Sequence, residues 1–350
     1  MTQALAPVPA APRSHAQVRQ RSAGRRIVAR PELSSLLGAI AVFVLFFVVA
    51  PPFREAAALS TVLYSSSTLG IVTVGVALLM IGGEFDLSAG VAVTTSSLVG
   101  SMFAFQLTLN VWVGVLFALV VSLGLGFLNG YLVMRTRLPS FLITLATFLM
   151  LQGLNLAITK LVTGNVATDS IADMSGFASA KAVFAADVHF GGVAVKITVF
   201  WWILFVAIAT WVLLRTRTGN WITAVGGQAD SARAVGVPVK ATKIGLFMTV
   251  GFGAWFLGMH QLFAFDSVQS GIGVGNELFY IAAAVVGGCL LTGGYGSAIG
   301  GAIGALIFGA TTQGIVYAGW NPDWVKFFVG AVLLVATLLN MWVRLRTSRR

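Results

Sequence analysis

Two neighbouring carboxylates, Glu84 and Asp86, stand in a glycine-rich segment between two long apolar runs. Acidic groups beside membrane-embedded runs can line an ion or solute path, because charge at that depth is costly and is kept mainly for function. Asp86 and Ser88 are also residue types that cap helices, since their side-chain oxygens accept hydrogen bonds from the free N–H groups of a first turn. The segment therefore predicts either a capped helix start or part of a translocation path and its gate.

Other polar groups stand within or beside the apolar runs. Such groups either hydrogen-bond one helix to the next or contact the hydroxyl groups of a solute. The candidate residues of a path or gate are Glu84, Asp86, Asn129, Thr144, Gln269, Asn276 and Glu277. The last three stand near Phe265 and Phe279 in one stretch that is expected to be an outer loop, where a solute would enter.

Motifs for catalysis, phosphate binding and metal binding are missing from the sequence. It contains no G-x-x-x-x-G-K-[ST], H-E-x-x-H, G-x-S-x-G or C-x-x-C. His15, His189 and His260 are far apart, and Cys289 is the single cysteine. We therefore expect no enzyme activity, metal site or cofactor in this chain, and an energy source outside it unless the chain is a passive pore.

The elements that must hold these residues are apolar helices. Of 350 residues, 57% are hydrophobic and 9% are charged, and the mean hydropathy is +0.92. Soluble domains carry about 25% charged residues, so most of this exterior must face lipid. The composition excludes a soluble enzyme, a nucleic-acid-binding domain and a disordered chain.

Charged residues divide the sequence into uncharged windows, and a spanning helix needs about 20 residues. Two windows are long enough for two helices each, with breaks expected near residues 106–110 and 292–296. The fold class predicted is an all-α polytopic membrane protein with about ten transmembrane helices. The windows are 33–53, 56–83, 87–134, 138–159, 197–214, 244–265, 278–322 and 327–343.

Basic residues set the orientation, because cytoplasmic loops carry an excess of Lys and Arg. With both termini in the cytoplasm, 17 of the 22 Lys and Arg residues lie inside and five outside. The net charge of +11 then reflects topology and contact with anionic membrane lipid, and no nucleic-acid partner is expected. The predicted segments are a disordered basic tail over 1–32, a transmembrane domain over 33–343, a periplasmic loop over 161–195, a cytoplasmic loop over 215–243 and a second basic tail over 344–350.

The cytoplasmic loop contains G-N-W-I-T-A-V-G-G-Q-A-D-S-A-R-A-V-G-V at residues 219–237. This resembles the coupling loop of ABC importer permeases of the ribose/simple-sugar type, in which a short helix fits a groove on the ATPase subunit. Asp and Ser replace the Glu and first Ala of the family's E-A-A-x-x-x-G pattern. The resemblance implies docking residues at Gly219, Trp221, Gly227, Asp230, Ser231, Ala232, Arg233 and Gly236.

Three further segments resemble the same family, in the same order. They are G-G-E-F-D-L-S-A-G at 82–90, N-G at 129–130 with L-P-S-F-L-I-T-L at 138–145, and G-V-G-N-E-L at 273–278 leading to G-G-Y-G at 293–296. The first carries one extra residue, because Glu84 and Phe85 stand where the family has one apolar residue. Asn276 replaces an aromatic residue of the third. The resemblance covers about residues 35–345.

The resemblance implies a permease subunit in a bacterial inner membrane that imports a sugar or sugar-like solute. Its partners would be ABC ATPase subunits that bind ATP and Mg, an extracytoplasmic substrate-binding protein, and a second permease copy or homologue. Two alternatives remain: an ion-coupled secondary transporter, and a permease for a nucleoside or other non-sugar solute. A membrane-integral enzyme or scaffold is disfavoured by the missing catalytic motifs.

Overall fold

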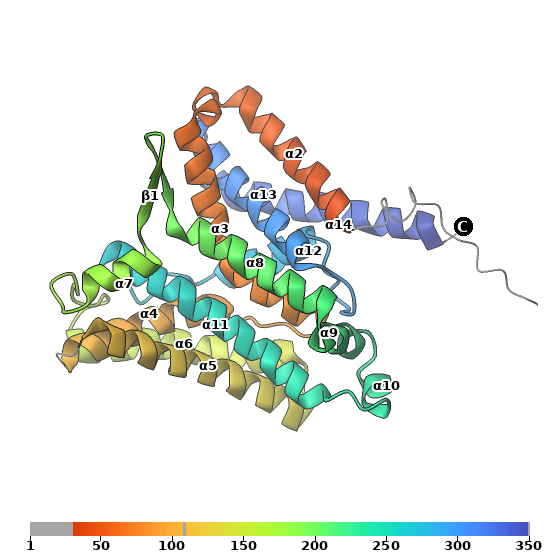
Figure 1. Ribbon diagram of the computed structural model, residues 1–350, viewed down its shortest axis with the longest axis horizontal. Coiled ribbons are helices and arrows are strands. Elements are labelled where there is room, and N and C mark those ends of the chain that lie inside the picture. The colour runs from red at the N-terminus through yellow and green to blue at the C-terminus, as the bar shows by residue number, and fades with distance from the viewer. Residues whose placement is uncertain (1–30, 108–109, 349–350) are drawn as a thin grey trace, which may run out of the picture.

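The computed structural model describes residues 31–107 and 110–348, and helices dominate this part of the chain (Figure 1). The predicted tail before residue 31 lies outside the described residues. The elements are α2 Pro31–Val49, η1 Pro51–Arg54, α3 Ala56–Ile81, α4 Ala89–Gln106, α5 Val111–Thr136, α6 Ser140–Thr163, α7 Phe177–Phe184, β1 Asp187–Phe190, β2 Val193–Lys196, α8 Ile197–Arg215, α9 Arg217–Gly227, α10 Ala229–Ala234, α11 Val239–Phe265, α12 Asn276–Val286, α13 Ala298–Tyr317 and α14 Trp324–Ser348.

The helices follow the uncharged windows. Both long windows are divided where a break is predicted, because α4 ends at Gln106 before α5 begins at Val111, and α12 ends at Val286 before α13 begins at Ala298. The outer bounds differ from the prediction: α2 already begins within the predicted first tail, and α14 continues into the second. A helix need not end where its apolar stretch ends, since flanking basic residues are enriched beside a membrane face.

Six described helices are long and apolar enough to cross a membrane: α3, α5, α6, α8, α11 and α13. Shorter apolar stretches lie in α2, α12 and α14. α4 is less apolar because protein surrounds it, and its consecutive polar residues Thr94, Thr95, Ser96 and Ser97 are all buried. The chain is a helical polytopic membrane protein as predicted, and ten crossings stay a prediction.

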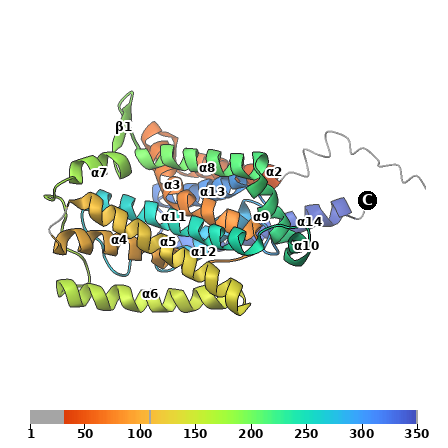
Figure 2. The same ribbon diagram turned by 60° about the horizontal axis from the view of Figure 1, so that its bottom comes forward.

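α3 and α11 form the centre of the bundle. The most apolar windows of these two helices are 72% and 78% buried, whereas those of α6 and α8 are each 22% buried. α11 packs on α3, α4 and α5, while α13 packs on α2, α3 and α12. Figure 2 shows α6 along one side of the bundle, beyond α4 and α5. α6 and α8 therefore have broad faces left for lipid.

α12 and α13 approach closely through glycine. A Cβ on Gly300 would overlap the carbonyl oxygen of Gly287, and one on Gly304 would overlap that of Ala283. Small residues spaced by four along a helix allow this contact. Close packing of α12 on α13 therefore accounts for Gly300 and Gly304.

The two segments predicted as opposite soluble loops lie at opposite ends of the bundle. Figures 1 and 2 show α7 and the hairpin at one end and α9 with α10 at the other. β1 and β2 pair antiparallel, and Lys196 Nζ lies 2.8 Å from Asp187 Oδ2 across them. This hairpin is a local exception within the predicted all-α fold, and its four-residue strands are too short to show an alternating pattern in the sequence.

Candidate functional site

The connection between α3 and α4 turns tightly and carries both candidate carboxylates. Gly83 has φ +83°, a left-handed conformation that favours glycine. The N–H of Gly83 donates to the carbonyl oxygen of Met80, and that of Glu84 donates to Leu79. The chain thereby leaves α3 without losing its backbone hydrogen bonds.

Asp86 is enclosed in a chain of hydrogen bonds. Its Oδ1 accepts from the backbone N of Ser88 at 2.8 Å and from Ser88 Oγ at 2.6 Å. Asn129 Nδ2 on α5 donates to Ser88 Oγ at 2.9 Å, and Thr147 Oγ1 on α6 donates to Asn129 Oδ1 at 2.7 Å. All four side chains are buried. The network joins the α3–α4 connection to two neighbouring helices.

Two polar side chains of α6, Ser140 and Thr144, bind the backbone of the same connection. Ser140 Oγ accepts from the N–H of Phe85 at 3.0 Å, and Thr144 Oγ1 accepts from the N–H of Leu87 at 3.1 Å. Unpaired N–H groups at membrane depth are costly, so α6 stabilises this irregular backbone. The burial of Asn129 and Thr144 favours the interhelical interpretation over direct contact with solute.

Electrostatics differ between the two candidate carboxylates. Asp86 is 3% exposed, and Ser88 donates two hydrogen bonds to its Oδ1. Glu84 instead forms an ion pair with Lys243 near the start of α11, and each side chain is 12% exposed. Removing one partner of such a pair leaves an uncompensated buried charge. The pair thus fastens the connection to α11.

The predicted capping function of Asp86 and Ser88 is only partly correct. Ser88 is the residue before α4, but its side chain makes no capping hydrogen bond. Asp86 accepts from the N–H of Ser88, ahead of the helix, and so closes a turn of the kind that Asp favours. Asp86 thus accepts a backbone hydrogen bond as predicted, but from the residue before α4 and not from the first turn of that helix.

The N-terminal end of α12 lies against that of α4. Thr94 Oγ1 donates to the carbonyl oxygen of Ile272. A Cβ on Gly90 would overlap Glu277 Oε2, so the two helices meet at a glycine. The chain therefore returns into the bundle after α11 through a series of bends and turns over 266–275, and the 11-residue α12 completes this passage.

Of the three residues predicted to cluster in an outer loop, Gln269 pairs with that loop, whereas Asn276 and Glu277 belong to α12. Gln269 is exposed and pairs with Ala167 in an isolated bridge. Glu277 is 6% exposed, and its two carboxylate oxygens accept from the N–H of Gly275 at 3.0 and 3.1 Å. Asn276 begins α12 beside it and is partly buried. The uncharged window 278–322 does not reveal that the segment before it, 266–275, re-enters the bundle.

The predicted coupling loop consists of α9 and α10. α9 is capped by Thr216 Oγ1, which accepts from the N–H of Gly219 at 3.2 Å. Ala232 is buried and packs in a small cluster with Val225 and Val239. Val235, directly after α10, is 80% exposed. Ala232 is therefore buried because it packs within the loop itself. The exposed side of α10 is the face that a partner can contact.

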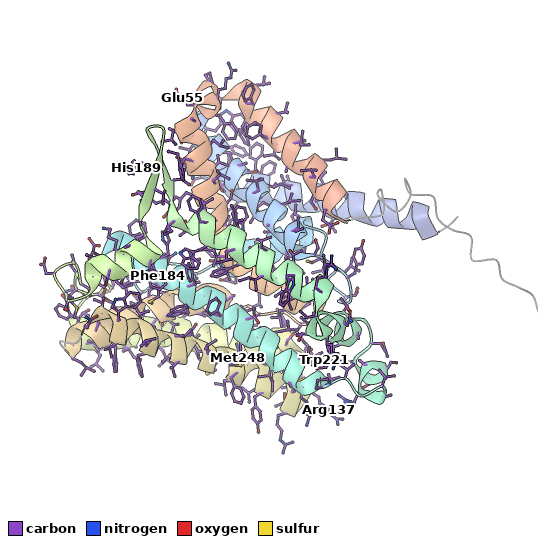
Figure 3. The ribbon with its side chains drawn as sticks, viewed as in Figure 1. Glu55, Arg137, Phe184, His189, Trp221 and Met248 are labelled. Atoms are coloured by element: carbon purple, nitrogen blue, oxygen red, sulfur yellow. The ribbon has the colours of Figure 1, made fainter. Side chains whose placement is uncertain are left out.

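The other predicted docking residues divide between the two sides of the loop. Gly219 is buried and Trp221 is partly buried. Figure 3 shows Trp221 at the end of the bundle near α11, far from His189 on the hairpin. Arg233 Nη1 lies 3.1 Å from Asp230 Oδ1. The exposed members are Gly227, Asp230, Ser231, Arg233 and Gly236.

Three loops meet at glycines where α9 ends. A Cβ on Gly226 would overlap the carbonyl oxygen of Ile81, the last residue of α3. A Cβ on Gly293 would lie 2.6 Å from Gly83 Cα and 2.7 Å from the carbonyl oxygen of Gly226. The N–H of Gly294 donates to the carbonyl oxygen of Ile81 at 2.8 Å. We name Gly83, Gly226, Gly293 and Gly294 the glycine junction.

Residues 58–337 match the family described as "Branched-chain amino acid transport system / permease component". The chain belongs to this family. The galactose/methyl galactoside import permease protein MglC of Escherichia coli (strain K12) is 31% identical, with 83% of this chain and 88% of the relative aligned. The ribose import permease protein RbsC of the same organism is 30% identical over 92% and 98%, and the fructose import permease protein FrcC of Rhizobium meliloti is 29% identical over 83% and 80%. No solved structure matches the permease.

The glycine junction of the permease was missed from the sequence. Its signal is the Gly-Gly pair that occurs in each of the three loops, at 82–83, 226–227 and 293–294. Each pair alone indicates only a turn. Their meeting depends on the packing of α3, α9 and α13 and cannot be read from spacing along the chain.

Substitution of Asp86 separates its charge from its hydrogen bonding. Asp86→Asn keeps an acceptor oxygen for Ser88, so we expect the permease to retain assembly and transport. Asp86→Ala leaves the buried groups of Ser88 without this acceptor, and we expect the free energy of unfolding to fall by about 1–3 kcal/mol. Thermal unfolding in detergent and solute uptake measure both effects. A normally expressed Asp86→Asn variant without transport would show that the charge itself is required.

Proposed function

We propose that this chain is the membrane-spanning subunit of an ATP-driven ABC importer for a sugar or sugar-like solute. The observation that carries the proposal is the alignment with a ribose import permease over 92% of this chain and 98% of the relative. The family description instead names branched-chain amino acids. The several relatives named for sugar import favour a sugar.

The ATPase subunits dock on residues 219–237 and hold the ATP and Mg. Val235 and the exposed side of α10 meet the ATPase, while the buried side of α9 faces the bundle. When ATP closes the ATPase pair, α9 moves and the glycine junction passes the movement to the α3–α4 connection. For ATP to drive this change, nucleotide must bind the inward-facing and outward-facing conformations of the transporter with different affinities.

The chain crosses the inner membrane ten times with both termini in the cytoplasm. One crossing is the irregular segment 266–275 together with α12. Irregular backbone at membrane depth is tolerated where protein buries it or where it lines a cavity. Substrate sites in other transporters lie near the midplane at discontinuous helices, which supports a solute path beside the meeting point of α4 and α12.

Two permease copies, or one copy and a homologue, enclose the path, and a substrate-binding protein delivers the solute to the outer face beside α7 and the hairpin. Within one copy, Asp86, Asn129 and Thr144 position the α3–α4 connection. Their enclosure supports this positioning function over contact with the solute. An ion-coupled carrier has no ATPase partner, so it would not explain the exposed face of α10.

Uptake of labelled solutes tests the solute class. The permease is reconstituted with its ATPase and binding protein, and ribose, galactose, fructose, leucine and a nucleoside are supplied in turn. We expect one sugar to accumulate and an excess of the same unlabelled sugar to compete. Accumulation of leucine or the nucleoside, with no sugar transported, would contradict the proposal.

A further inference from the structure

An apolar groove runs along the bundle between α3, α8, α9 and α11. Its volume is about 540 Å³, and aliphatic and aromatic side chains such as Val74, Leu78, Phe205 and Phe252 dominate its lining. It lies apart from the polar network around Asp86, and the proposed transport mechanism makes no use of it.

Glycines open this groove. Gly75 brings α3 against the backbone of α11, since a Cβ there would lie 3.1 Å from the carbonyl oxygen of Thr249. Gly245 on α11 lines the groove, and a Cβ there would meet no atom within 4 Å. A side chain at this position would therefore project into open space.

The surroundings of the groove indicate lipid. The outer face of α8 beside it is apolar, with Ile208, Trp211 and Leu214 at least half exposed. Apolar area of this kind on a spanning helix is covered by acyl chains. A groove with apolar walls, open along such a face, suits an acyl chain.

The cytoplasmic end of the groove carries positive charge. α8 ends at Arg215 and α9 begins at Arg217, and both are exposed. Within the described part of the chain neither arginine forms a salt bridge. Val212 and Thr218, on either side of this corner, line the groove. The N-terminus of α9 adds a partial positive charge that favours a phosphate.

The geometry points to a site for an anionic phospholipid. One acyl chain fills the groove, and the phosphate lies at the α8–α9 corner beside Arg217 and the first turn of α9. Trp221 and Ile222 of α9 line the groove together with residues of α3 and α11, so the bound lipid holds α9 against these two helices. An effect of this lipid on coupling rests on the proposed function, whereas the binding itself does not.

Native mass spectrometry of the purified full-length permease, titrated with phosphatidylglycerol, tests the site. We expect Gly245→Leu to fill the groove and abolish saturable lipid binding. Gly153→Leu is the matched control, because Gly153 is a helical glycine on the exposed face of α6 whose Cβ would also meet no atom within 4 Å. We expect Arg217→Gln to weaken binding about fivefold, since one basic residue near an anionic surface contributes about 1 kcal/mol.

Three outcomes would overturn the site. Equal phosphatidylglycerol binding by the Gly245→Leu and Gly153→Leu variants would show that the groove holds no lipid. Equally tight binding of phosphatidylcholine would show that the α8–α9 corner does not recognise an anionic headgroup. Separation of permease copies by Gly245→Leu, with lipid binding unchanged, would identify the groove as an interface between copies. These measurements of lipid binding do not depend on transport. They would therefore test the lipid site even if the proposed transport function were wrong.

Discussion

Replacing Gly226 by alanine is expected to uncouple the permease from its ATPase, while the same replacement at Gly227 is expected to leave uptake near the wild-type rate. A Cβ on Gly226 would overlap the carbonyl oxygen of Ile81, whereas a Cβ on Gly227 would meet no atom within 4 Å. Overpacking of this kind costs about 1–3 kcal/mol, which corresponds to about 5–150-fold in an equilibrium between two states. The two variants add the same methyl group to adjacent residues.

The effect of Gly226→Ala is measured as solute imported per ATP hydrolysed in reconstituted complexes. We expect ATP hydrolysis and association with the ATPase to persist, because the exposed face of α10 is unchanged, while uptake falls. Loss of membrane insertion would indicate a folding defect, which the yield of folded protein detects. Equal uptake by both alanine variants would show that the glycine junction does not transmit the movement.

Val235→Asp is expected to abolish docking of the ATPase while the permease still inserts. Val235 is 80% exposed at the end of the bundle that carries α9 and α10. An aspartate at this position would replace an apolar contact at the centre of the proposed interface. Loss of a central contact weakens the free energy of binding by about 2 kcal/mol or more. We therefore expect the affinity for the ATPase to fall about 30-fold or more.

Co-purification of tagged permease with the ATPase measures the effect of Val235→Asp. Leu161→Asp is the control, because Leu161 is 85% exposed near the C-terminal end of α6, where no ATPase contact is proposed. Undiminished association in the Val235 variant would exclude docking on this face. A bulky residue at Ala232 is a poorer test, since Ala232 is buried within the loop and its replacement would disrupt the loop itself.

Composition and charge predict the helical, membrane-embedded fold because side chains that face lipid must be apolar and the backbone between them must satisfy its own hydrogen bonds. That rule weakens where protein surrounds a helix. α4 carries Thr and Ser at consecutive buried positions, and α12 is only half-length. Hydropathy alone cannot distinguish a helix that crosses the membrane fully from an irregular segment followed by a short helix.

The candidate site was predictable in its residue types and only partly in its arrangement. Asp86, Asn129 and Thr144 come together as one hydrogen-bonded region because α5 and α6 carry their polar groups at helical spacing toward the α3–α4 connection. Gln269 lies apart, and Glu277 meets Gly90 instead of lying in an outer loop. The contact of Glu277 with Gly90 depends on close approach at a glycine, and the sequence does not reveal which element will approach that glycine.

Uptake into sealed proteoliposomes, with and without ATP, tests most directly whether an external ATPase drives transport through this chain. The permease, its ATPase and its binding protein are reconstituted, and labelled sugar is followed in the presence of ionophores that collapse ion gradients. The account predicts uptake that requires ATP and the ATPase and persists with the ionophores. Gradient-driven uptake by the permease alone, abolished by the ionophores and indifferent to ATP, would contradict it.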